Sequence, residues 1–205
     1  MYQKQCKFIS FILLMLSIKA TAQIQKEKLT DKLYFPFGIG YLNSPHNNLK
    51  AGIIVNMAAE YRLHSTQGMF FRLSYDNRSN SYKRNEISGT NITQGKLEFN
   101  DFLLGAGYRF NGQHKLRYFT LMQSGPSLCE YQQVISTNET YQVKDKSTTI
   151  PVVKLLFGSE YYIGKSAAIS LDAGYIWSLK NTPFEQNHLY EGALSVSIGL
   201  TTNLF

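Results

Sequence analysis

Two segments far apart in the chain carry residues that could together activate a nucleophile. Ser44 and His46 lie close together in one, and His188 is followed by Glu191 in the other. A serine whose histidine is oriented by a carboxylate can form a covalent intermediate. The chemistry requires both segments to meet in space, and residues of these types are common in solvated loops. We therefore predict loop residues here, no catalytic residue and no enzymatic activity.

The remaining histidines and glycines point to no metal or cofactor. His64 and His114 stand without metal-ligand spacing, and the sequence has no Cys-x-x-Cys. Gly38-Ile39-Gly40 and Gly105-Ala106-Gly107 lack the third glycine and the following helix of a phosphate-binding loop. We expect these glycines to be small residues on one face of a strand.

The first 22 residues have the order of a secretory signal. Lys4 and Lys7 precede an apolar run over 8–18, and Ala20-Thr21-Ala22 supplies the small residues of a cleavage site. Eleven residues are too few for a transmembrane helix, which needs about 20. A buried N-terminal helix is the alternative. We predict cleavage after Ala22, a periplasmic segment over 23–32 and one domain over 33–205.

The charge distribution narrows the class of partner, and the cysteine content excludes an intramolecular disulfide. The chain has 21 bases and 14 acids, and without the three lysines of the signal the net charge is +4. Basic residues are dispersed, which argues against a nucleic-acid partner. Cys129 is the only cysteine after residue 22, so no intramolecular disulfide can form.

The chain after the signal alternates between apolar and polar residues, with no 3.6-residue periodicity. From Ala51 to Leu63 the odd positions are apolar, and the even positions are mostly small or charged. Successive side chains of a strand point to opposite faces, so this pattern predicts a two-faced strand. The same pattern predicts eight strands, at 33–43, 49–63, 68–82, 95–110, 115–131, 148–163, 166–179 and 189–205.

Three positions disturb this pattern. Pro36 and Pro151 stand inside predicted strands, although proline removes a donor and favours strand ends or bulges. Leu97 and Phe99 are out of phase with Phe102 and Leu104, which predicts a bulge near Asn100.

The connections alternate between tight and long. The turns 64–67, 111–114 and 164–165 are short, whereas 83–94, 132–147 and 180–188 are longer and polar; 44–48 is of intermediate length. An even number of antiparallel strands with short turns at one end and longer loops at the other is typical of a transmembrane β-barrel.

The sequence resembles the small eight-stranded outer-membrane barrels of the OmpA and OmpX type, and most closely the plain outer-membrane barrels of Bacteroidota. The resemblance rests on the signal ending at Ala22-Gln23, on the strand from Leu103 to Phe110 and on the last strand ending at Phe205. It implies a monomer in the cell outer membrane, surrounded by lipid and assembled by periplasmic chaperones and the barrel assembly machinery. Phe205 departs from the expected phase, so either the strand slips near Thr201-Thr202 or Phe205 lies beyond it.

The facing of the strands gives two further expectations. Aromatic residues at both strand ends predict two girdles, with Tyr34, Phe35, Tyr61, Phe70, Phe71, Tyr108, Phe110, Tyr118, Tyr161 and Tyr162 at the tight-turn end and Tyr41, Tyr131, Trp177 and Tyr190 at the loop end. The polar faces place a paired charge network in a closed lumen, formed by Lys50, Arg62, Arg72, Arg78, Arg109, Arg117 and Lys154 with Glu60, Asp76, Asp101, Glu160, Asp172 and Glu191. One register places Glu60 opposite Arg72 and Asn56 opposite Asp76.

These expectations predict a structural or surface-interaction role, with an unidentified extracellular ligand as a possible partner. Two alternatives stay open. A soluble, exported, lipocalin-like carrier would place its apolar residues inside, around an apolar ligand. A barrel enzyme that modifies lipids would use the loop residues described first.

Overall fold

Eight antiparallel strands form a closed barrel, as the alternating pattern predicted. The structure is a computed structural model that describes residues 32–43, 50–64, 68–83, 94–110, 115–137, 140–164, 166–179 and 192–203. The predicted signal over 1–22 and the rest of the chain before Lys32 lie outside these residues. The strands are β1 (Leu33–Asn43), β2 (Gly52–Arg62), β3 (Gly68–Lys83), β4 (Gln94–Phe110), β5 (Leu116–Thr137), β6 (Thr140–Tyr162), β7 (Ala167–Ser178) and β8 (Gly192–Thr202).

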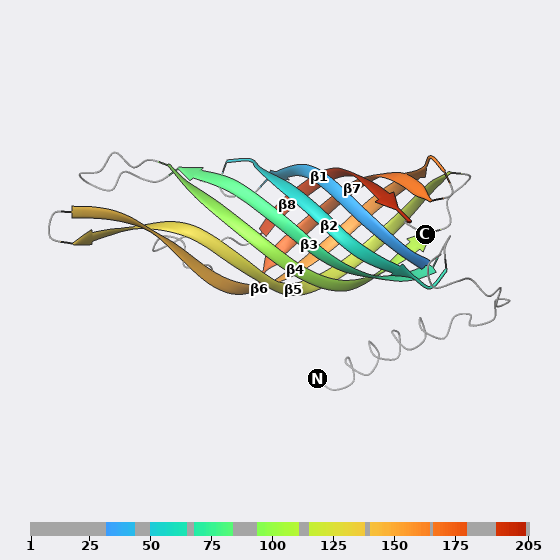
Figure 1. Cartoon of the computed structure of the whole chain (residues 1–205), viewed down its shortest axis with the longest axis horizontal. Coiled ribbons are helices and arrows are strands. Elements are labelled where there is room, and N and C mark those ends of the chain that lie inside the picture. Colours follow the sequence, from blue (N-terminus) through green and yellow to red (C-terminus); the bar gives the residue numbers. More distant parts are fainter. Residues whose placement is uncertain are drawn as a thin grey trace, which may run out of the picture.

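Each strand pairs with its neighbours in sequence, and β8 closes the barrel on β1 (Figure 1). Following the paired residues once round the wall leads from Leu33 on β1 back to Asn43 on the same strand, a stagger of ten residues. For eight strands this stagger corresponds to a tilt of roughly 40° and an interior that side chains can fill.

The largest difference from the predicted elements is the hairpin of β5 and β6. These strands continue to the pair Thr137 and Thr140, so most of the predicted long loop over 132–147 is strand. Pairing between β4 and β5 ends at Leu97 and Tyr131, and pairing between β6 and β7 ends at Val152 and Ser178. The hairpin therefore extends beyond both neighbours, as Figure 1 shows at its left-hand side.

The predicted bulge near Asn100 is wrong. Pairing of β4 with β3 runs in one unbroken register from Gly68–Arg109 to Lys83–Gln94. The pairs of β4 with β5 keep one register on both sides of Asn100. The phase change of the apolar residues has another cause, which the barrel interior explains below.

The two prolines occupy positions where a donor is not needed for a continuous ladder. Pro36 pairs with Thr201 on β8 but is absent from the β1–β2 pairs. The carbonyl of Pro151 accepts a hydrogen bond from the Leu179 N–H, just beyond β7, at 2.9 Å. Because the nitrogen and the carbonyl of one strand residue point the same way, the missing N–H of Pro151 faces the side where β7 ends.

The last strand keeps its register to its end. Thr201 pairs with Pro36, and Thr202 pairs with Ala167. Of the two alternatives for Phe205, the slip at Thr201-Thr202 therefore does not occur. Leu204 and Phe205 lie outside the described residues.

Candidate functional site

The outer face of the barrel wall is a belt of exposed apolar side chains. Leu73, Leu104 and Leu171 are 58%, 63% and 57% exposed, and Leu73 and Leu171 each lie between buried polar neighbours on their strands. The belt continues round the wall through Phe37, Ile39, Tyr41, Ile53, Met57, Phe71, Phe102, Met122, Leu155, Phe157, Ile169, Leu194, Val196, Ile198 and Leu200. This facing is the reverse of a soluble carrier, whose apolar residues line the interior.

A cluster of arginines round Glu60 fills the tight-turn end of the interior. The carboxylate of Glu60 is fully buried and accepts hydrogen bonds from three guanidinium groups. Its Oε2 lies 2.6 Å from Arg72 Nη2, and its Oε1 lies 2.5 Å from Arg62 Nε and 3.0 Å from Arg109 Nη2. A buried carboxylate is stable only with such partners.

Glu160 is the second acid of this cluster. It accepts hydrogen bonds from Arg109 Nη2 at 2.8 Å and from Arg62 Nη2 at 3.2 Å. The Tyr162 hydroxyl donates to Glu160 Oε2 at 2.9 Å and accepts from Arg62 Nη1 at 2.6 Å. The Arg62 guanidinium also lies 3.5 Å from the centre of the Tyr34 ring, a favourable cation–π contact.

Aromatic rings pack against the guanidinium groups of the arginine cluster. Phe70 and Phe119 pack edge to face at 5.9 Å, and both are buried. Arg109 lies 4.6 Å from the centre of the Phe70 ring, and Arg72 lies 5.1 Å from that of Phe119. Leu121 and Leu156 complete this small apolar cluster. The charged groups are therefore excluded from water by packing as well as by pairing.

The middle of the interior is polar but less fully paired. Lys154 Nζ lies 2.5 Å from Asp76 Oδ2, and Gln123 Nε2 donates to Ser74 Oγ at 2.7 Å. Asp172 is also buried, and its Oδ1 has no hydrogen-bond partner among the described residues.

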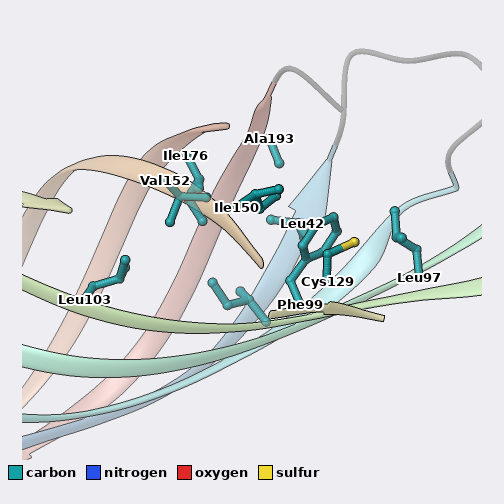
Figure 2. Packing of buried hydrophobic residues seen from close by; sticks show 10 residues of the cluster. Leu42, Leu97, Phe99, Leu103, Cys129, Ile150, Val152, Ile176 and Ala193 are labelled. Carbon is teal, nitrogen blue, oxygen red and sulfur yellow. The ribbon is translucent and has the colours of Figure 1, made fainter. Parts of the chain in front are cut away.

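The loop end of the interior is apolar. Arg78 donates to Asp101 at 2.6 and 2.9 Å, and its guanidinium lies 4.4 Å from the centre of the Phe99 ring. Beyond this pair the interior is closed by Leu42, Ile54, Leu97, Phe99, Leu103, Cys129, Ile150, Val152, Ile176 and Ala193. Figure 2 shows this group, with Leu42, Phe99, Cys129 and Ile150 gathered inside the strands.

The wall thus changes its facing along the strands without changing register. We call the residues 77–83, 94–100, 127–137 and 140–151 the projecting section, and the rest of the wall the belt section. In the projecting section Leu97 and Phe99 are buried inside, whereas Glu98 and Asn100 face outward. On β4, side chains outside become polar where those inside become apolar, which explains the phase change that predicted a bulge.

Most of the predicted lumen charges lie inside, and the predicted pairing of Glu60 with Arg72 is confirmed by register and by contact. The register also places Asn56 opposite Asp76. Lys50 was wrongly placed in the lumen, because it is exposed at the rim, where its backbone N–H donates to the Ser81 carbonyl. Arg117 is half-buried, with its guanidinium 4.3 Å from the centre of the Tyr162 ring.

The aromatic girdles are confirmed in part. At the tight-turn end, exposed rings on the outer face come from Phe71, Tyr108, Phe110, Tyr118 and Tyr161, and at the loop end from Tyr41 and Trp177. Four residues were assigned to the wrong face. Tyr34 and Phe70 are buried inside, Tyr162 binds the interior arginines and Tyr131 packs against the apolar group at the loop end.

The residues first considered for catalysis cannot be placed. Ser44, His46, His188 and Glu191 lie outside the described residues, as does Tyr190. Within the described part of the chain, no group of three or more histidine, cysteine or acidic residues could hold a metal ion. No helix of that part is long and apolar enough to cross a bilayer.

A closed antiparallel barrel with an apolar outer belt and a charged interior defines the class of small outer-membrane β-barrels. No family model and no curated protein sequence matches the chain. Among solved structures, Neisserial surface protein A is similar over 84% of this chain and 97% of its own, with 13% identity and a TM-score of 0.55. OprG from Pseudomonas aeruginosa is similar over 83% of this chain and 95% of its own, with 10% identity and a TM-score of 0.50. At these identities the likeness concerns the fold.

Proposed function

We propose that this protein is an integral barrel of the cell outer membrane with a structural or surface-interaction role. The observation that carries the proposal is the continuous belt of exposed apolar residues round a closed barrel whose interior holds the charges. A bilayer core offers no hydrogen bonds to unpaired backbone groups, and a closed barrel leaves none along its wall. Lipid would cover the belt section, and the tight turns would face the periplasm.

The proposed role includes a lumen closed to ions. The buried charges of the described residues balance, with Arg62, Arg72, Arg78, Arg109 and Lys154 against Glu60, Asp76, Asp101, Glu160 and Asp172. The apolar group of the loop end lies above them and is fully buried. Side chains fill an eight-stranded barrel, so we expect no steady conductance from the reconstituted protein in a planar bilayer.

The projecting section supports a role at the cell surface. β6 between Thr140 and Pro151 pairs with β5 alone among the described strands. The odd residues of this stretch share the orientation of Pro151, so their N–H and carbonyl groups point away from β5. Such an edge can accept an extended segment of another polypeptide. The proposed partner is therefore an unidentified extracellular chain that adds a strand.

Gel electrophoresis of the outer-membrane fraction with and without boiling tests the placement. We expect a band that migrates differently before boiling, because a folded barrel resists the detergent. A soluble periplasmic protein without this shift would overturn the proposal.

The strand-addition role is tested by Ser147→Pro in the free edge of β6. This position is chosen because Ser147 pairs with β5 alone, whereas a residue such as Ser159 pairs on both sides and its replacement by proline would disrupt the barrel. Surface binding of extended peptides should fall in Ser147→Pro while the heat-dependent shift is kept.

Biogenesis and assembly state belong to the same proposal. We infer that periplasmic chaperones and the barrel assembly machinery insert the chain, and that it stays a monomer in lipid. The proposal includes no catalytic step and no cofactor.

A further inference from the structure

The outer face of the β3–β4 hairpin changes its chemistry one cross-strand pair at a time. These pairs stand directly opposite each other, and their side chains share the outward face of the wall. From the tight-turn end to the loop end the pairs are Leu73–Leu104, Tyr75–Phe102, Asn77–Asn100, Ser79–Glu98 and Ser81–Lys96. The order is aliphatic, aromatic, amide, hydroxyl with acid, and hydroxyl with base, which is the order of groups along a lipid from its acyl chains to its headgroup.

We call this series of five pairs the side-chain ladder. Its amide pair, Asn77–Asn100, is held in place by hydrogen bonds from within the pair and from Tyr75. The Tyr75 hydroxyl donates to Asn100 Oδ1 at 2.6 Å, and Asn77 Nδ2 donates to the same oxygen at 2.8 Å. The carbonyl oxygen of Asn100 is therefore occupied. Its amide N–H groups and the carbonyl oxygen of Asn77 have no partner among the described residues, so the pair presents donors and an acceptor side by side.

The aromatic pair Tyr75–Phe102 lies directly beside the amide pair. The rings of Tyr75 and Phe102 are 5.2 Å apart with an angle of 51° between their planes, and Phe102 is 47% exposed. An exposed ring face next to fixed amides suits the C–H face and hydroxyl groups of a sugar. A phosphate accepts hydrogen bonds but donates none, so the free acceptor on Asn77 favours hydroxyl groups over phosphate.

No other pair of the described strands places two side-chain amides opposite each other on the outer face. At the corresponding ends of other strands the outward pairs are Pro126–Pro151 on β5 and β6 and Trp177–Gly192 on β7 and β8. The ladder is therefore a local feature of one hairpin, whereas a general interface girdle would recur round the wall.

We propose that the outer face of β3 and β4 binds a lipid with a sugar headgroup from the outer leaflet. The acyl chains lie along Leu73 and Leu104, and the sugar contacts the rings of Tyr75 and Phe102 and the amides of Asn77 and Asn100. This inference rests on the proposed placement in the outer membrane.

The test uses the full mature chain, folded into phosphatidylcholine nanodiscs that contain a few mole per cent of a dihexosyl diacylglycerol. Native mass spectrometry after detergent release counts the retained glycolipid. The double variant Asn77→Ala/Asn100→Ala should retain about tenfold less, since it loses hydrogen bonds to the sugar. The matched control is Asn43→Ala, an exposed amide at the loop end of β1 that stands opposite Leu194, and it should retain as much as the unaltered chain.

The outcomes separate this inference from the proposed function. Equal glycolipid retention in the double variant and the unaltered chain would overturn the inference, as would preferential retention of phosphatidylglycerol in a parallel disc. Complete displacement by free maltose would also overturn it, because the ligand would then be a soluble sugar. If the unaltered chain shows no heat-dependent gel shift, the placement in the membrane fails first. If it inserts and selects no glycolipid, only the inference fails.

Discussion

On β4 the belt section and the projecting section belong to one strand but have opposite facing. In the belt section of β4, Leu104 is 63% exposed, and Asp101 is buried at the upper limit of that section. Six residues further up the same strand from Leu103, Leu97 is fully buried and Glu98 points outward. The alternation of side chains is the same throughout. What differs is which chemical class occupies the inward positions.

The proposed placement in the outer membrane explains this difference by the solvent outside the wall. Lipid around the belt section favours apolar side chains outside, and buried charges inside must then be paired. Water around the projecting section favours the usual arrangement of a soluble sheet, with an apolar face inside. In that placement the point of inversion marks where the strands leave the membrane.

The largest expected effect comes from removing the acid that holds three arginines. Glu60→Gln leaves Arg62, Arg72 and Arg109 buried without their shared carboxylate. Removing one partner of a buried ion pair costs about 3–5 kcal/mol of unfolding free energy. Urea titration in lipid vesicles, followed by the gel shift, measures this loss.

The control for this change is Glu98→Gln in the projecting section. Glu98 pairs with Lys96, and that pair is partly solvent-exposed. An exposed ion pair contributes about 0–1 kcal/mol. Equal losses in both variants would show that the interior charges are hydrated, and the contrast between the two sections would then fail for charge.

The next effect concerns the outer face of the belt section. Leu171→Arg introduces a charge at mid-strand on β7, where it faces outward. A charge at the bilayer midplane costs about 2–4 kcal/mol of insertion free energy. The matched control is Leu179→Arg, because Leu179 has similar exposure (65%) but lies beyond the last residue of β7.

Near the interface the same change costs about 0–1 kcal/mol. Asp172→Asn, on the inward face beside Leu171, should also impair insertion less than Leu171→Arg. A folding titration that gives one value for all three variants would contradict the facing of β7.

A smaller effect distinguishes the two faces of the projecting section. Ile150→Val removes one methylene from a fully buried position, whereas Thr149→Ser removes one methyl from its exposed neighbour. The first should cost about 0.5–1.5 kcal/mol and the second less than about 0.5 kcal/mol. The unfolding midpoint of each variant gives the comparison. A larger loss from Thr149→Ser would mean that the outer face is the packed one.

The fold of the belt section could be predicted from the sequence because its strands have a strict two-residue period. The register of β2 and β3 followed from a tight turn and from matching charge, and this is why the contact between Glu60 and Arg72 was predictable. Assigning the faces also used the alternation of tight and long connections, since parity alone does not tell inside from outside.

The projecting section was harder to predict because its polar composition is that of a loop. The stretch over 132–147 has few apolar residues, yet backbone pairing continues to Thr137 and Thr140. The phase of Leu97 and Phe99 was misread for a related reason. The bulge near Asn100 was predicted on the assumption that apolar side chains face the same side along the whole of β4. The change in which face is apolar was therefore interpreted as an extra residue in the strand.

The last prediction concerns a buried thiol at the lower end of the projecting section. Cys129 is fully buried among the apolar residues of the loop end, and it is the only cysteine after residue 22. A thiol without water access reacts slowly with polar reagents. The folded mature chain should therefore stay unmodified by a charged maleimide, and urea should make it reactive. Labelling at urea concentrations at which the unboiled sample still migrates as the folded barrel would show that the projecting section opens while the belt section stays folded. The two sections would then differ in stability as well as in facing.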